Sequence, residues 1–206
     1  MATMPLSPGA SSSAPRDNDD RWSLVWHALI IYYTFDSIFA FFLSLASFIA
    51  NLIYHAIVSA AGPSACPVSQ IMFILSGVTF ATRFIDMVLG CCTLGCWCCG
   101  GGDAKRDRAL LGHIRNCILI CGTQCGLALA SIVVAIYGMV QFGEECMGSI
   151  VSIVFALLLL ADAGWELFIW IGAYWMRLNQ HQIAIPKMVD NLIPTFLYDW
   201  ARKHRL

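Results

Sequence analysis

Charged residues are scarce in this sequence. Asp, Glu, Lys and Arg account for 12% of the 206 residues, whereas hydrophobic residues account for 59% and the mean hydropathy is +0.71. A soluble domain carries about 25% charged residues. A chain with so few charges cannot cover a globular surface with solvated groups, so we expect lipid to be its solvent over most of that surface.

The sequence also lacks several motifs that would indicate a particular class of function. The sequence lacks a basic face, which argues against a nucleic-acid-binding protein. It lacks a glycine loop with a lysine for binding phosphate. None of its histidines stands at a motif spacing from Cys or Asp; they are His27, His55, His113, His181 and His204. We therefore expect neither an enzyme nor a bound cofactor or metal, and we assign no catalytic residue.

The first residues also lack the apolar segment of a secretory signal peptide. Residues 1–23 are rich in Pro, Ser and Asp, and stretches of this kind cannot bury enough apolar surface to fold. We expect them to form a disordered cytoplasmic tail.

The sequence does contain four long apolar stretches, at about residues 24–52, 68–94, 116–140 and 150–176. A membrane-spanning helix needs roughly 20 mostly apolar residues. Spanning segments of this kind are helical, because backbone groups left unpaired in hydrocarbon cost several kcal/mol each. The sequence predicts an all-α protein, with a transmembrane four-helix bundle over residues 24–178 and a cytoplasmic tail at 179–206.

Outside these stretches, Lys and Arg are confined to three places. Two Arg precede the first stretch, a basic group at 105–108 with Arg115 just beyond it follows the second, and a third group at 177–205 follows the fourth. The other two loops contain none. Because Lys and Arg concentrate on the cytoplasmic side, we expect both termini and the middle loop to be cytoplasmic, in the plasma membrane or an endomembrane.

The ten cysteines form three groups, of which the first is a pair in the two non-cytoplasmic loops. Cys66 and Cys146 would face an oxidising compartment, where a disulfide can persist. We predict that they are bonded; the alternative is two unpaired thiols near the membrane surface.

The second group lies at the cytoplasmic end of the second stretch and comprises Cys91, Cys92, Cys96, Cys98 and Cys99. Clustered cysteines beside a membrane are typical sites of S-palmitoylation, which is the interpretation we favour. A zinc site is the sharper alternative, because Cys96 and Cys99 have C-x-x-C spacing. Zinc ligands normally come as two separated pairs, however, and the next loop offers no second pair. Plain apolar filler is the third possibility.

The third group repeats every fourth residue along the third stretch, at Cys117, Cys121 and Cys125. A second stripe of small residues runs beside it, at Gly122, Gly126 and Ala130. Small residues at this spacing allow helix backbones to approach closely. We interpret the two stripes as a helix-packing face.

Polar residues also interrupt the apolar stretches, at Asp36, Arg83, Asp86, Gln124, Asp162 and Glu166. Arg83 and Asp86 are three residues apart and Asp162 and Glu166 four apart, so each pair shares one helix face. Intramembrane charges usually face the bundle interior. Arg83 is the only base among four acids, so not every acid can be both ionised and paired. We therefore predict that at least one of the acids is protonated at neutral pH. A buried ion-pair network, a path for protons or cations, and a lipid- or ligand-binding pocket are the competing interpretations.

The last residues combine aromatic and basic side chains, including Phe196, Trp200 and Arg202. Such segments tend to lie on an anionic membrane surface. Binding to a cytosolic partner is the alternative.

One family resemblance rests on the loop cysteines. Cys66-Pro-Val68 opens the second stretch after a short loop, and Cys146 precedes the fourth. In these features and in overall spacing the chain resembles the four-span proteins called transmembrane protein two-seven-two-like, and its layout resembles that of MARVEL-type proteins. The resemblance covers the four-span region and implies a multi-pass membrane protein of unassigned activity. The cysteines at 91–99 fall outside that family's pattern.

These observations favour a non-enzymatic scaffold or accessory subunit of a membrane complex, in contact with the lipid bilayer and with other membrane proteins or copies of itself. The alternative is an oligomeric channel or a proton- or cation-conducting subunit that uses the intramembrane acids.

Overall fold

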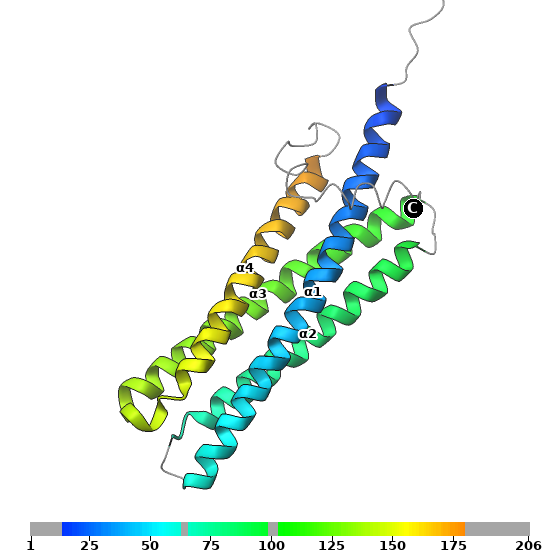
Figure 1. Cartoon of the computed structure of the whole chain (residues 1–206). Coiled ribbons are helices and arrows are strands. Elements are labelled where there is room, and N and C mark those ends of the chain that lie inside the picture. Colours follow the sequence, from blue (N-terminus) through cyan, green and yellow to red (C-terminus); the bar gives the residue numbers. More distant parts are fainter. Residues whose placement is uncertain (1–13, 63–65, 99–102, 180–206) are drawn as a thin grey trace, which may run out of the picture.

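The computed structural model describes residues 14–62, 66–98 and 103–179. Within these ranges the chain is helical and forms no strand. Its elements are α1 (Ala14–Ala61), α2 (Ser69–Cys98), α3 (Asp103–Phe142), the short 3-10 helix η1 (Gly143–Cys146) and α4 (Ser149–Asn179), as shown in Figure 1. The four α-helices are long and apolar enough to cross a membrane.

Two of the helices extend well beyond the apolar stretches that predicted them. α1 begins at Ala14 and ends at Ala61, and α3 begins at Asp103 within the expected middle loop. Hydropathy marks the length that lipid can cover, whereas a helix also continues through charged residues such as Arg and Lys, whose helix propensity is high. The expected disordered tail therefore loses residues 14–23 to α1, and the tail at 180–206 lies outside the described residues.

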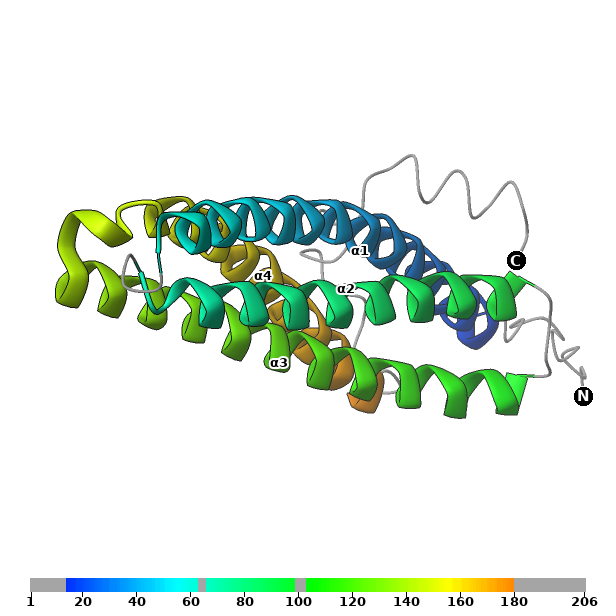
Figure 2. The ribbon, with the colours of Figure 1, turned by 90° about the horizontal axis from the view of Figure 1, so that it is seen from below.

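The bundle consists of two helix pairs. α1 packs chiefly against α2 and α3 chiefly against α4, while the contacts of α2 with α3 and of α1 with α4 are sparser. α2 and α4 therefore lie diagonally across the bundle (Figures 1 and 2). We call the end where α1 and α3 begin and α2 and α4 end the terminal end, and the opposite end, which holds the disulfide described below, the disulfide end.

The turn between α3 and α4 is short and depends on one glycine. Gly143 follows the last residue of α3 and has a φ of 58°. Only glycine adopts this left-handed conformation without steric cost, which makes it the usual residue just after a helix. η1 then leads directly into the start of α4.

The interior of the bundle is apolar at both ends and polar between them. The terminal end is filled by a cluster of bulky side chains, among them Trp22, Trp26, Ile30, Ile114 and Trp170. The disulfide end is filled by a smaller cluster: Val58, Cys66, Val68, Met72, Ala135 and Cys146. We call these the terminal cluster and the disulfide cluster. The buried side chains between them include an arginine, two carboxylates, an amide and several hydroxyls.

Candidate functional site

Arg83 is the centre of the polar interior. Its side chain is fully buried on α2, and its Nη2 lies 2.5 Å from Oδ2 of Asp162 while its Nη1 lies 2.7 Å from Oε2 of Glu166. Nη1 is also 3.6 Å from Oδ2 of Asp86, one turn further along α2. Asp162 and Glu166 belong to α4, so the guanidinium reaches diagonally across the bundle and joins the two helix pairs.

The other two helices also contact this network. On α1, the Tyr33 hydroxyl donates to Oδ1 of Asp86. On α3, the Cys121 thiol donates to Oε2 of Glu166 over 3.6 Å. Gln124, also on α3, is buried beside Asp86. All four helices therefore supply a polar side chain to one cluster, which we call the ion cluster.

Asp36 lies at the edge of the ion cluster rather than in it. Its side chain is half-buried and, among the described residues, makes no salt bridge with Arg83. It lines a narrow crevice between α1 and α4 together with Tyr32 and Glu166. On the surface of this seam the indole Nε1 of Trp165 donates to the Tyr32 hydroxyl over 3.1 Å.

The six intramembrane polar residues singled out from the sequence thus gather in one region of the fold. Five of them belong to the ion cluster and Asp36 adjoins it. Removing one partner from a buried ion pair leaves an uncompensated charge and costs about 3–5 kcal/mol. Loss of Asp162 or Glu166 would therefore be costly, because each is paired with Arg83.

A second polar region lies between the ion cluster and the disulfide cluster. The Ser152 hydroxyl of α4 donates to Oδ1 of Asn51 on α1 over 2.6 Å, and Asn51 Nδ2 donates to the carbonyl of Ser47 over 2.9 Å. Beside them is a cavity of about 10 Å³, close to the smallest volume that holds one water molecule. Its polar lining comprises Ser47, Asn51, Ser76, Thr79, Ser131 and Ser152.

Sequence reasoning missed this second region, although a signal was available. Along α1 the buried residues Ser37, Ser44, Ser47 and Asn51 recur at helical spacing. Polar residues on one face of a spanning helix indicate an inward-facing stripe. Hydroxyls were overlooked because each can bond a carbonyl of its own helix, as Ser44, Ser76 and Thr79 do.

Aromatic rings close the ion cluster on the side of the terminal end. Tyr33, His113 and Trp170 meet edge to face, with ring centroids 5.0–5.6 Å apart. The His113 ring also lies 3.2 Å from the Thr93 hydroxyl and 3.5 Å from the Cys117 sulfur. His113, to which the sequence assigns no role, therefore lines the polar interior on the side of the terminal end.

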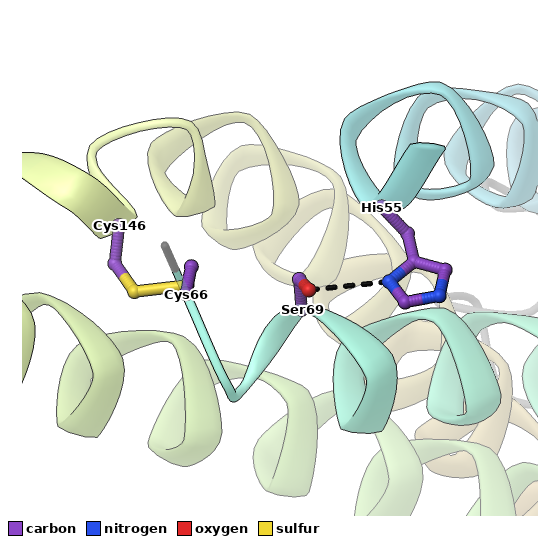
Figure 3. The surroundings of a disulfide bond; sticks show 4 residues. All are labelled: His55, Cys66, Ser69 and Cys146. Carbon is purple, nitrogen blue, oxygen red and sulfur yellow. Dashed lines mark hydrogen bonds between the residues drawn. A yellow bond between two sulfur atoms is a disulfide. The ribbon is translucent and has the colours of Figure 1, made fainter. Parts of the chain in front are cut away.

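At the opposite end, the two loop cysteines lie at bonding distance. The sulfur atoms of Cys66 and Cys146 are 2.06 Å apart, and both residues are buried (Figure 3). Cys66 precedes α2 and Cys146 ends η1, so this disulfide is a second link between the two helix pairs. Close by, Nδ1 of His55 lies 3.2 Å from the Ser69 hydroxyl.

The cysteine cluster of α2 is described only in part. Cys91 and Cys92 are exposed free thiols on the last turns of the helix, towards the terminal end. Cys99 lies outside the described residues, as do the side chains of Cys96 and Cys98. No three His, Cys, Asp or Glu within the described residues are placed to hold a metal ion.

The two small-residue stripes of α3 face different ways. Cys117 and Cys121 are buried and Cys125 is half-buried, whereas Gly122 and Gly126 are exposed, with no heavy atom within 4 Å of where a Cβ would lie. The neighbouring Ala130 is half-buried. The glycine stripe therefore does not hold α3 against the other three helices, because α3 is rotated to place its cysteine stripe and Gln124 inward.

Comparison with protein-family models, with curated proteins and with solved structures gives no match. The resemblance to four-span families stays a prediction. The function has to be argued from the polar interior itself.

Proposed function

We propose that this chain is a non-enzymatic four-span membrane scaffold or accessory subunit of a membrane complex. The observation that carries the proposal is the use of the intramembrane charges: Arg83 binds Asp162 and Glu166 on the diagonal helix, so the charges join the two helix pairs. Its buried charged residues form ion pairs between helices inside the bundle. A bundle held together in this way is suited to presenting a fixed outer surface to lipid and to other membrane proteins.

The apolar clusters at both ends support the same proposal. The terminal cluster and the disulfide cluster close the polar interior on both sides, and the cavity between them is about the size of one water molecule. A catalytic or ligand-binding pocket for a drug-sized molecule usually has a volume of about 300–1,000 Å³. The cavity beside Asn51 and Ser152 is far smaller.

The experiment compares the wild type with the variant Asp162→Asn/Glu166→Gln, purified in detergent. A scaffold is expected to lose yield, monodispersity and thermal stability in this variant, because the buried Arg83 loses its two closest carboxylates and keeps only the more distant Asp86. The exposed pair Glu144 and Glu145 on η1 gives the matched control, Glu144→Gln/Glu145→Gln. Equal stability of all three proteins would contradict the proposal.

A second candidate function is favoured by one specific observation. Polar side chains run from Asn51 and Ser152 through Thr79 to Arg83 and Glu166, along much of the bundle interior. A proton- or cation-conducting subunit would use such a row, opening the two apolar clusters to do so. Flux through liposomes tests it: a conductor would keep its fold in Asp162→Asn/Glu166→Gln and lose its flux.

We further propose that both termini face the cytoplasm and that cysteines near the end of α2 are acylated. The exposure of Cys91 and Cys92 makes these thiols accessible for modification. The test treats the protein with hydroxylamine and measures released fatty acid. The wild type is expected to release it, whereas a variant with Ser at positions 91, 92, 96, 98 and 99 is expected to release none. An unmodified wild type isolated from membranes would contradict acylation.

A further inference from the structure

The seam between α1 and α4 brings two carboxyl groups together. Asp36 of α1 and Glu166 of α4 line the same crevice, which has no room for a water molecule. Both carboxyl groups therefore border the same narrow space between α1 and α4.

Each of these carboxyl groups has one oxygen that lacks a donor. Glu166 is 2% exposed; its Oε2 accepts from Arg83 and from Cys121, whereas its Oε1 has no hydrogen-bond partner among the described residues. Oδ2 of Asp36 is buried and likewise has none within the described ranges. Buried polar atoms in proteins are almost always hydrogen-bonded, so these two oxygens require an explanation.

A proton between the two carboxyl groups supplies the missing donor. Two carboxylates that share a site cannot both be ionised, because their like charges repel strongly at short range in a medium of low dielectric constant. We propose that Asp36 and Glu166 form a proton-binding site in the α1–α4 seam, in which one proton at neutral pH is held between the two carboxyl groups.

The groups around this pair determine how firmly the proton is held. Those nearest to it come from all four helices: Tyr32 and Tyr33 on α1, Arg83 and Asp86 on α2, Cys121 on α3, and Asp162 on α4. The single positive charge of Arg83 is already shared among Asp86, Asp162 and Glu166. A negative charge added at Asp36 would therefore meet no free cation among these groups.

The proton has a structural consequence that does not depend on either proposed function. α1 and α4 make the sparsest contacts of the adjacent helix pairs. Loss of the proton would place two negative charges across this seam, so α1 would be repelled from α4. The pair would then serve as a pH-dependent closure between α1 and the rest of the bundle.

Infrared spectroscopy of the full-length protein in lipid tests the proposal, because the carbonyl stretch of a protonated carboxyl is separate from the bands of a carboxylate. The wild type at neutral pH is expected to show this stretch. Carbon-13 labelling of the side-chain carboxyls of Asp, of Glu or of both should shift the frequency of the band. A folded wild type without this band overturns the proposal, and this measurement requires no variant.

Two isosteric variants locate the proton. Asp36→Asn and Glu166→Gln each introduce an amide donor that can bond the remaining carboxylate directly, so each is expected to abolish the band. Asp162→Asn leaves both members of the pair in place and should retain it. Persistence of the band in either Asp36→Asn or Glu166→Gln, or its loss in Asp162→Asn alone, would show that the proton resides elsewhere. Asp36→Asn keeps every ion pair of Arg83, so it remains decisive if Glu166→Gln fails to fold.

Discussion

Arg83 shows at the scale of one residue why a costly group is kept inside a membrane protein. A charged side chain at the bilayer centre costs on the order of 3 kcal/mol on insertion scales. The contacts of Arg83 that would offset such a cost are short ones with two carboxylates of the diagonal helix and a longer one with Asp86. The guanidinium is suited to the role because its planar donors can bind two carboxylates at once.

Replacement of Arg83 by Leu is expected to destabilise the protein by about 3–5 kcal/mol, because Asp162 and Glu166 are left buried without a cation. Thermal unfolding in detergent, followed by circular dichroism, measures the change. The control is Arg115→Leu, since Arg115 is exposed on α3 and surface substitutions usually change stability by about 0.5 kcal/mol or less. Equal loss of stability in both variants would mean that the ion cluster contributes nothing specific.

A smaller effect is expected for the hydrogen bond between α1 and α4. Ser152→Ala removes the donor to Asn51 Oδ1, and hydrogen bonds between membrane helices average about 0.6 kcal/mol, with a maximum near 1.7 kcal/mol. Ser131→Ala is the matched control, because the Ser131 hydroxyl donates only to a carbonyl of its own helix. The same unfolding measurement compares the two variants. If Ser131→Ala destabilises the protein as much as Ser152→Ala, the hydrogen bond between Ser152 and Asn51 contributes nothing specific to stability.

At the scale of elements, the bundle is two helix hairpins held together at separate levels. The ion cluster links them in the interior and the disulfide links them at one end. Both links run between the α1–α2 pair and the α3–α4 pair, whose mutual contacts are sparse compared with those inside each pair. Polar and covalent bonds thus reinforce the interface that helix packing leaves weakest.

Loss of the disulfide is expected to weaken this interface without unfolding the helices. Cys146→Ser should lower the free energy of unfolding by about 2–4 kcal/mol, the typical contribution of a disulfide. Cys66→Ser and the double variant should match it, because all three remove the same bond. Thermal unfolding under non-reducing conditions makes the comparison. A reactive thiol at Cys66 in the unreduced wild type would contradict the bond itself.

Much of this could be predicted from the sequence, but helix rotation could not. Hydropathy located the four helices, and the spacing of Arg83 with Asp86 and of Asp162 with Glu166 placed each pair on one face. On α3, however, the cysteine and glycine stripes are adjacent in sequence, and each residue turns the helix by about a quarter turn. Which stripe faces inward depends on the neighbouring helices. The same holds for Asp36 and Glu166, whose meeting requires that α1 adjoin α4.

At the scale of the whole molecule, the ends of the described helices fall into two groups. α1 and α3 begin and α2 and α4 end at the terminal end, while the disulfide lies at the other end. The basic residues that predict a cytoplasmic location begin α3 at the terminal end. The disulfide end would then face an oxidising compartment, as a disulfide requires.

This orientation predicts the sidedness of introduced labels. Acceptor sequons for N-glycosylation inserted at residues 62–65 or after Glu144 should be glycosylated in microsomes, whereas one inserted at residues 100–102 should not. The shift in mass on glycosidase treatment reads the result. The opposite pattern would show that the orientation is the reverse of the one proposed, with the disulfide in a reducing compartment.

We propose that the intramembrane charges lock the bundle together and do not carry ions through it. The decisive experiment measures proton and cation flux into liposomes containing the purified wild-type protein, beside protein-free liposomes and liposomes containing Asp162→Asn/Glu166→Gln. A folded wild type is expected to give no flux above the protein-free level, and the variant is expected to be less stable. Flux through the wild type that disappears in an equally stable variant would overturn the proposal.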